Sequence, residues 1–480
     1  MPADVNSVVK TYDVRGLVDS ELTDDIVEAL AAAFVDVIGA HDTSIVVGHD
    51  MRDSSPRFVS AFTRGARARG ADIISIGLCS TDETYFASGS WDLPSAMFTA
   101  SHNPSTYNGI KLSRAGAQSL SADTGLFEVR DRAREYLLNG IPTVDTTGTV
   151  TERDVLTDYA SYLRHLVDVA HIRPLRIVVD AGNGMAGLTV PAVLGTSAGL
   201  PELPIEVIPM YFELDGTFPN HEANPLNPAN IVDLQNAVIA HGADMGLAFD
   251  GDADRCFVID ERGEPMSPSA VAALVAVREI ERVKAKGERD VTVLHNLITS
   301  DVVPQTIRAA GAVAIRTNVG HSLIKDIMRE TGAVFGGEHS AHYYFRDFWG
   351  ADNGMLAALH VIAELGRGSE PLSTLSARYS PYIQSGEINS VVADVDSAFE
   401  RIRDAFAGRG LFDTLDGLTV SSADRSAHEL PPQSVEDREF WWFNVRASNT
   451  EPLLRLNVES GSQSSMESVR DEVLALIRQN

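Results

Sequence analysis

Short apolar runs rich in β-branched residues alternate with longer amphipathic segments along most of the chain. The apolar runs predict strands at 44–48 (SIVVG), 72–76, 175–180 (LRIVVD), 245–249 (MGLAF) and 291–294. Apolar residues at helical spacing predict helices at 57–69, 304–310 and 322–330. Alternation of strands with helices is typical of parallel sheets covered by helices, so the pattern predicts an α/β architecture.

Segments rich in proline, glycine and polar residues divide the chain at 140–151 (GIPTVDTTGTVT), 260–268 and 366–371 (GRGSEP). The remaining tail predicts a strand at 389–395, a helix at 398–407, two strands around 441–460 and a closing helix near 466–477. We therefore expect α/β domains at 1–148, 149–259 and 260–368, and a smaller α+β domain at 369–480. The three α/β units could be divergent copies of one unit.

Length and charge narrow the classes of function. A chain of 480 residues is too long for one compact core. Lys and Arg total 39 against 67 Asp and Glu, a formal net charge of -28 that repels nucleic acid and anionic membrane. We expect neither partner, and a small anionic substrate would need a local positive pocket.

The chain's two cysteines, Cys79 and Cys256, argue against a disulfide framework or a cysteine zinc site. No signal peptide is visible at the N-terminus. The longest uncharged stretch, 181–200, holds five glycines and a proline and is poorly suited to a spanning helix. A cytoplasmic location is the expectation.

The clearest chemical signal is the loop 249–255, Phe-Asp-Gly-Asp-Ala-Asp-Arg. Asp250, Asp252 and Asp254 follow a predicted strand, and three crowded carboxylates call for a cation; hard oxygen ligands favour Mg²⁺. A solvated acidic turn is a blander interpretation, although buried-type strands bracket the loop. An EF-hand calcium loop is rejected because Arg255 stands where glycine is needed and strands flank the loop.

A second signal is the segment Thr-Ala-Ser-His-Asn-Pro at 99–104, followed by Asn-Gly-Ile-Lys at 108–111. Ser101 beside His102 could act as a nucleophile or phosphate carrier. Taken alone, such a pair is more often structural, and the Gly-x-Ser-x-Gly signature of a hydrolase is missing around it. A magnesium loop elsewhere shifts the balance toward phosphoryl transfer.

Two further segments carry polar side chains suited to a sugar phosphate. The segment 446–452 (RASNTEP) combines a guanidinium, hydroxyls and an amide in a predicted turn, which suits a phosphate cradle, although a plain polar hairpin turn accounts for such a segment in isolation equally well. In 336–342 (GGEHSAH), Glu338 and Ser340 would point to the same side of an extended segment and contact sugar hydroxyls. Zinc is disfavoured there, because the run lacks the His-Glu-x-x-His spacing.

The run Gly-Asn-Gly-Met-Ala-Gly at 182–187 follows a predicted strand and fits a dinucleotide-binding pattern, with Glu206 and Glu213 as possible ribose-binding acids. A dinucleotide-dependent oxidoreductase is therefore a remote alternative. A tight strand-to-helix turn that requires small residues is the preferred interpretation, because it leaves the aspartate loop and the serine segment free for other work, whereas cofactor binding explains neither.

Together with Tyr12-Asp13-Val14-Arg15-Gly16, these segments resemble the α-D-phosphohexomutase superfamily, most closely its phosphomannomutase/phosphoglucomutase branch. The motifs occur in the family's order from residue 12 to residue 455. The resemblance implies four domains around a central cleft, the first three α/β and related, each contributing one site loop.

The resemblance also implies roles for residues of this chain. Ser101 would carry the transferred phosphoryl group, and Asp250, Asp252 and Asp254 would hold Mg²⁺ together with a phosphoserine oxygen. Around the reacting phosphate and the sugar, it implies contacts from Tyr12, Arg15, His102, Lys111, Arg255, His321, Glu338, Ser340 and His342, with Lys111 and His342 as candidate proton movers. Arg446, Ser448, Asn449 and Thr450 would grip the non-reacting phosphate.

Two positions depart from the family pattern. A lysine is common near His295 and Asn296, so one cationic contact is in doubt. Ala341 stands where glycine is common, which would slightly stiffen the sugar loop.

The predicted activity is interconversion of mannose 6-phosphate and mannose 1-phosphate through a phosphoserine and a hexose 1,6-bisphosphate, which also serves as the activator. A phosphoglucomutase, a dual-specificity enzyme and a non-catalytic relative stay open as alternatives. We expect a sugar-phosphate substrate and a monomer or homodimer.

Overall fold

The computed structural model describes residues 4–392, 394–425, 440–447 and 453–479, apart from the side chains of His321 and Ser322. It divides into two compact units, described separately below. The first comprises Met1–Met266, Lys325–Glu330 and Ala341–Ser373; the second comprises Ser267–Ile324, Thr331–Ser340 and Thr374–Asn480.

The first unit begins with a mixed sheet that carries the serine segment. Its strands, in spatial order, are β1 (Val14–Leu17), β5 (Tyr107–Arg114), β4 (Ser95–Phe98), β2 (Ser44–His49), β3 (Asp72–Leu78) and β7 (Val150–Glu152), with β6 (Gln118–Ser119) beside β5. The pairs around β2 and β3 are parallel, whereas β5 runs antiparallel to both β1 and β4.

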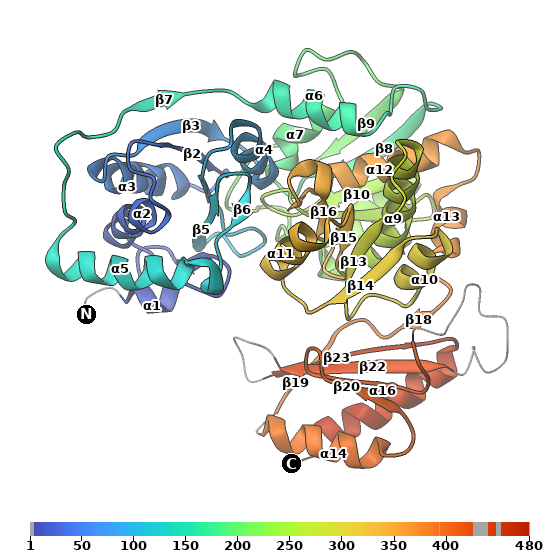
Figure 1. Ribbon diagram of the computed structural model, residues 1–480. Helices are drawn as coiled ribbons and strands as arrows, with labels where there is room; N and C mark the ends of the chain where they lie inside the picture. Colours follow the sequence, from blue (N-terminus) through green and yellow to red (C-terminus); the bar gives the residue numbers. More distant parts are fainter. Residues whose placement is uncertain (1–3, 393, 426–439, 448–452, 480) are drawn as a thin grey trace. The chain divides into compact units, whose positions relative to one another are not determined.

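Side chains alternate between the two faces of this sheet. Ile45 and Phe98 join the main core beneath α2 (Asp24–Ile38), α3 (Ser55–Ala68) and α5 (Leu126–Asn139). Met97 points the other way, where its sulfur lies 3.2 Å from the Thr84 hydroxyl of α4 (Thr81–Trp91). Figure 1 shows the three helices on one side of the sheet and α4 on the other. The short elements are α1 (Val5–Val8) and η1 (Ala122–Thr124).

A second sheet in this unit carries the aspartate loop. Its order is β12 (Pro265–Met266), β11 (Cys256–Asp260), β10 (Met245–Phe249), β8 (Leu175–Asp180) and β9 (Ile205–Met210). The associated helices are α6 (Leu156–Leu166), α7 (Ala186–Val193), η2 (Pro228–Ile231) and α8 (Val232–His241). Because β10 and β11 form an antiparallel hairpin with Phe249 opposite Cys256, the loop between them is held at both ends.

The rest of the first unit includes the antiparallel pair β16 (Tyr343–Phe345) and β17 (Ala351–Asp352), joined through η3 (Arg346–Phe348), and the helix α12 (Gly354–Arg367). Two helices, α11 (His321–Thr331) and α13 (Leu372–Arg378), contain residues of both units.

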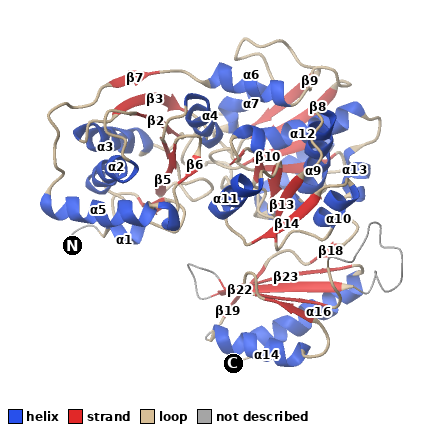
Figure 2. Ribbon diagram, in the orientation of Figure 1, coloured by secondary structure: helices blue, strands red, loops and turns tan. Residues whose placement is uncertain are grey.

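The second unit contains a parallel set of strands and a separate antiparallel sheet. The parallel set is β14 (Val313–Thr317), β13 (Thr292–Asn296) and β15 (Phe335–Gly337), with α9 (Pro268–Ala285) and α10 (Val302–Ala309). The antiparallel sheet follows the order β18 (Ile383–Gln384), β23 (Leu453–Ser460), β22 (Trp441–Ala447), β21 (Leu418–Ser421) and β20 (Leu411–Asp413), with β19 (Ile388–Val391) also on β23. Helices α14 (Val395–Phe406) and α16 (Gln463–Ile477) cover one face of this sheet (Figure 2) and share its core.

Two predicted segments differ from the structure. The strand expected at 389–395 ends at Val391, and α14 already begins at Val395 because the Asp394 side chain accepts a hydrogen bond from the backbone N–H of Ser397. The extended segment expected through Glu338 and Ser340 ends at Gly337, and His339 and Ser340 form a turn.

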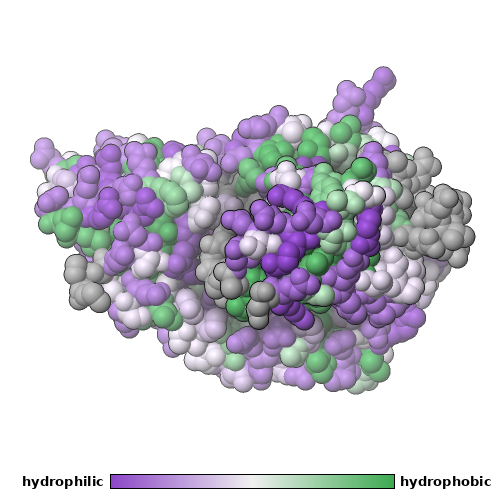
Figure 3. Space-filling view, turned by 90° about the horizontal axis from the view of Figure 1, so that it is seen from below, coloured by the Kyte–Doolittle hydropathy of each residue, from purple (hydrophilic) through white to green (hydrophobic). Residues whose placement is uncertain are grey.

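Hydrophilic side chains predominate on the face drawn in Figure 3, with hydrophobic ones in small groups. Among the described residues, none of the helices is long and apolar enough to cross a membrane. Cys79 and Cys256 are both buried and unpaired with each other, as the cysteine count predicts.

Candidate active site

The serine segment follows β4 and is held in an unusual backbone conformation. Ser101 has a φ of 49°, a left-handed conformation that a non-glycine residue adopts only when its surroundings enforce it. The guanidinium of Arg52, fully buried, donates to four carbonyl oxygens of this segment: Ser101 (2.9 Å), Asn103 (2.7 Å), Pro104 (2.8 Å) and Tyr107 (3.0 Å). One side chain therefore fixes the whole turn around the serine.

The aspartate loop is fitted closely against this segment. A Cβ atom at Gly251 would stand 2.5 Å from the carbonyl oxygen of Ser101, so the two backbones meet at a distance that only glycine permits. On its other side the loop rests on the glycine turn after β8, where the N–H of Met185 donates to the Gly251 carbonyl (2.9 Å). A Cβ at Gly184 would stand 2.7 Å from that same oxygen, so the run at 182–187 forms the tight turn of small residues considered above.

The Ser101 hydroxyl lies between an acid and a cation. It donates to Asp250 Oδ2 (2.9 Å) and stands 3.2 Å from His102 Nδ1 and 3.4 Å from Arg255 Nη2. Arg255 also donates from Nε to Asp250 Oδ2 (2.8 Å) and contacts His102 Nδ1. Burial, together with the charges of Arg255 and Arg15, places the pKa of His102 well below its ordinary value, so the imidazole is neutral.

Lys111, on β5, pairs with the two other carboxylates of the loop. Its Nζ donates to Asp252 Oδ2 (2.7 Å) and to Asp254 Oδ2 (2.6 Å). Burial alone would lower the pKa of Lys111, but the charges of Asp252 and Asp254 outweigh it and hold the pKa well above its usual range. The ammonium is therefore charged in this arrangement.

The three carboxylates suit a metal ion. Each can offer an oxygen within 4.8 Å of the others, and all three are buried. Asp252 Oδ1 and Asp254 Oδ1 are buried without a hydrogen bond from any residue that the structure describes. The three acids face two cations, Lys111 and Arg255, so the cluster keeps a net negative charge. Burial raises the pKa of Asp250 to about 7, although Arg255 lies beside it and lowers the pKa. A cation bound by oxygen ligands would satisfy both the charge and the free oxygens.

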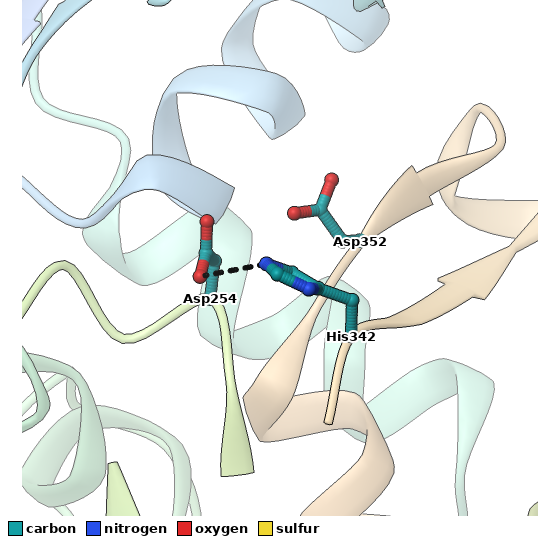
Figure 4. Close-up of side chains that lie close together, drawn as sticks. All are labelled: Asp254, His342 and Asp352. Carbon is teal, nitrogen blue, oxygen red and sulfur yellow. Dashed lines mark ion pairs between the residues drawn. The ribbon is translucent and has the colours of Figure 1, made fainter. Parts of the chain in front are cut away.

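Arg15 and His342 lie at the border of this cluster. Arg15, on β1, donates from Nη1 to Asn103 Oδ1 (2.6 Å) and pairs with Asp13 (2.5 Å), so it braces the serine turn from outside. The His342 side chain points toward Asp254 and Asp352 (Figure 4), with Nε2 at 3.9 Å from Asp254 Oδ1. Tyr12 is half-buried in the turn just before β1.

The remaining predicted residues belong to the second unit. Glu338 is buried, and its Oε1 accepts from Asn296 Nδ2 (3.2 Å) and from the N–H of Gly320 (3.4 Å). Arg446, at the end of β22, pairs with Glu387 (3.0 Å). Ser340 lies in the turn after β15 and His321 begins α11. The side chain of His321 and the residues Ser448, Asn449 and Thr450 lie outside the described part of the chain.

The structure also describes the two positions, His295 and Ala341, at which the sequence departs from the family pattern. His295 is buried, and burial together with the nearby charge of Arg425 lowers its pKa to about 3, so the imidazole supplies no positive charge in place of the lysine that the resemblance implies. Ala341 adopts a φ of 65°, the conformation that favours glycine.

Sequence reasoning missed Arg52 as a functional residue. Its signal is the polar run His-Asp-Met-Arg-Asp-Ser-Ser at 49–55 directly after a buried strand, a position where loop residues of α/β sheets serve sites. That run shows only that the loop is polar. The four carbonyl partners of Arg52 lie 49 to 55 positions away in the sequence, where pattern analysis does not reach.

With these features in place, the chain was compared with known proteins. Four family models match in order: phosphoglucomutase/phosphomannomutase α/β/α domain I at 6–136, domain II at 157–263, domain III at 267–382, and the C-terminal domain at 387–476. The chain belongs to the phosphoglucomutase/phosphomannomutase family.

Individual relatives span the same length. The phosphomannomutase of Escherichia coli (strain K12) is 37% identical over 476 residues, covering 98% of each chain. The "phosphohexose mutases" protein of Xanthomonas campestris pv. campestris is 38% identical over 477 residues, again covering 98% of each. A solved family protein of Burkholderia thailandensis superposes with a TM-score of 0.83 at 27% identity, covering 100% of this chain and 98% of the other. The predicted family, fold class and enzyme class are thus confirmed.

Proposed function

We propose that the protein is a Mg²⁺-dependent phosphomannomutase that interconverts mannose 6-phosphate and mannose 1-phosphate. The observation that carries the proposal is the position of the Ser101 hydroxyl, 2.9 Å from Asp250 in a buried loop of three carboxylates and beside Arg255. A phosphoryl group on this oxygen would bring about two negative charges at neutral pH. It would meet Arg255 and the metal loop directly.

The reaction follows as two phosphoryl transfers. In the first, the bond between Ser101 Oγ and phosphorus breaks and Oγ takes up a proton, while a sugar hydroxyl forms the new bond to phosphorus and gives its proton to a base. The product is a hexose 1,6-bisphosphate. In the second, the Ser101 hydroxyl loses its proton to a base and forms the new bond to the phosphorus at the other end of the sugar, while the bond from that phosphorus to the sugar oxygen breaks and the sugar oxygen takes up a proton. The intermediate must turn around between the steps, since one serine serves both ends.

The residues around Ser101 have separate tasks in this scheme. Arg255 contacts the serine oxygen and balances charge on the transferred group. Lys111, held charged by two aspartates, acts as a cation or a proton donor in this state. His342, whose Nε2 lies 3.9 Å from Asp254 Oδ1, would move a proton beside the cluster. Bound at Asp250, Asp252 and Asp254, Mg²⁺ would supply positive charge against the phosphoryl oxygens.

Substrate contacts would come from the second unit. Glu338, oriented by Asn296, offers a carboxylate to sugar hydroxyls, and Ser340 follows it in the turn. Arg446, with Ser448, Asn449 and Thr450, would bind the phosphate that does not react, by the charge-assisted hydrogen bonds that guanidinium groups form with phosphate. Mannose as the sugar rests on the relatives, several of which are phosphomannomutases.

The test is a coupled assay with mannose 1-phosphate, Mg²⁺ and a hexose 1,6-bisphosphate primer, run beside the same assay with glucose 1-phosphate. We expect turnover that requires both Mg²⁺ and primer, with the higher kcat/KM for mannose. Ser101→Ala should abolish turnover, whereas Ser113→Ala, a buried serine of β5, should retain it. Full activity of Ser101→Ala would refute the assigned role of Ser101. No turnover of either sugar by the wild type would overturn the proposed function.

A further inference from the structure

The N-terminus of α4 contacts the aspartate loop through one residue, Thr81. The Thr81 side chain donates from Oγ1 to Asp252 Oδ2 at 2.6 Å, and its backbone N–H donates to the Asp252 carbonyl at 3.1 Å. Both residues are fully buried. Thr81 lies in the segment that matches domain I and Asp252 in the segment that matches domain II. This pair therefore ties the element beside the serine-bearing sheet to the candidate metal loop.

The position of Thr81 is fixed by the turn that precedes it. Ser80 and Glu83 form a capping box in which the Ser80 N–H donates to Glu83 Oε2 (2.8 Å) and the Glu83 N–H donates to Ser80 Oγ (3.3 Å). Tyr159, from α6, adds a hydrogen bond to Asp82 (2.5 Å). These hydrogen bonds fix the start of the helix, and they therefore fix the position of the Thr81 hydroxyl. Metal ligands are commonly oriented by outer hydrogen-bond partners of this kind.

The hydrogen bonds on Asp252 divide its two oxygens. Oδ2 accepts from both Thr81 Oγ1 and Lys111 Nζ, whereas Oδ1 accepts from no residue that the structure describes. Two donors on one oxygen lock the rotation of the carboxylate and leave the other oxygen for a cation. Without the threonine hydroxyl, Lys111 would be the one donor to this carboxylate in the described part of the chain, and Lys111 is shared with Asp254.

We propose that Thr81 is a positioning residue for the metal site: its hydroxyl orients Asp252 so that Oδ1 faces the bound cation. The inference rests on the proposed function for the identity of the site, and it adds a residue from outside the aspartate loop. Removal of an outer hydrogen-bond partner of a metal ligand lowers metal affinity by about 10- to 100-fold. Thr81 should therefore change the affinity of the site for the metal ion without contacting the sugar.

The test compares three variants of the full-length protein. Thr81→Val keeps the volume and the backbone hydrogen bond but removes the hydroxyl; Thr81→Ser keeps the hydroxyl. Thr84→Val is the matched control, because Thr84 is equally buried on the same helix and its hydroxyl contacts Ser80 and Met97 instead of the loop. Binding of Mn²⁺ is followed by electron paramagnetic resonance and of Mg²⁺ by calorimetry, without substrate.

We expect Thr81→Val to weaken metal binding by about 10- to 100-fold, with Thr81→Ser and Thr84→Val close to the wild type. Unchanged affinity in Thr81→Val, or an equal loss in Thr84→Val, would overturn the inference. Wild-type protein that binds the metal but converts no hexose phosphate would overturn the proposed function and leave the role of Thr81 standing. Turnover by the wild type, with the metal affinity of Thr81→Val unaltered, would leave the proposed function standing and overturn the role of Thr81.

Discussion

Arg52 offers a sharp test of how the serine turn is held. Its guanidinium makes four hydrogen bonds to the carbonyls of 101–107, a fifth to Asp50 Oδ2 (3.1 Å), and lies 5.2 Å from the centre of the Phe218 ring. Lysine at this position would keep the charge but has one nitrogen, which cannot reach carbonyls spread over both ends of the guanidinium.

The expected loss follows from these contacts. A hydrogen bond to a charged group contributes about 1.5–3 kcal/mol, and breaking a buried ion pair by removing one partner costs about 3–5 kcal/mol. Because these effects overlap and lysine retains part of the pairing with Asp50, we expect Arg52→Lys to lower the free energy of unfolding by about 3–5 kcal/mol. The same variant should lower kcat, since Ser101 would no longer be held in its left-handed conformation.

Urea unfolding followed by circular dichroism measures the first effect, and hydrogen exchange of the amides at 101–107 locates it. Arg57→Lys is the control, because Arg57 is exposed on the next helix, and among the described residues its ion pairs are with Asp19, which is exposed, and Asp24, which is partly exposed. Its effect should stay within about 0.5 kcal/mol. If Arg52→Lys unfolds like the wild type and protects the amides of 101–107 equally, Arg52 does not hold the turn and the reasoning fails.

Two further predictions concern the phosphate grip and the first turn of α4. Arg446→Ala should raise KM by about 10- to 100-fold for mannose 1-phosphate and for glucose 1-phosphate, with little change in kcat, because each substrate would lose one charge-assisted hydrogen bond. Initial-rate kinetics measure both constants. A rise in KM for one sugar alone would contradict a shared phosphate contact. Burial raises the pKa of Glu83 from 4.5 to about 8, so between these pH values the folded protein keeps a proton that the unfolded chain releases, and the free energy of unfolding falls as pH rises. Glu83→Gln replaces the titrating carboxyl group by an amide. The variant's free energy of unfolding, measured by urea unfolding, should therefore fall less steeply from pH 5.5 to 7.5, by about 1.4 kcal/mol per pH unit. Equal slopes for the variant and the wild type would show that Glu83 is already ionised in the folded state.

Much of the fold could be predicted because local pattern and tertiary role agree. The strand at 245–249 is buried throughout and the strand at 175–180 is buried except at Arg176, and the structure has both with the predicted bounds. The error at 389–395 has a local cause: the run Val-Val-Ala-Asp-Val is rich in strand-forming residues, but Asp394 caps a helix. Capping by one side chain outweighs a weak β preference.

In the candidate site, too, some residues could be predicted from the sequence and others could not. The aspartate loop was predicted from its three closely spaced carboxylates and Ser101 from its place in a polar turn beside that signal, and the structure brings Ser101 and Asp250 together across 149 positions. Thr81 and Arg52 were missed because a threonine in the first turn of a helix and an arginine in a polar loop are ordinary locally. Their importance comes from contacts with Asp252 and with the serine turn, and those contacts exist only in the folded chain.

The central claim is that the Ser101 oxygen carries the phosphoryl group between the two ends of the sugar. The most direct measurement incubates the protein with mannose 1,6-bisphosphate and Mg²⁺ and maps the modified peptide by mass spectrometry, before and after addition of mannose 1-phosphate. The account predicts a single phosphoryl group on Ser101 that is lost to the added sugar as bisphosphate forms. Turnover with Ser101 unmodified throughout, or with the phosphoryl group on another residue, would contradict it.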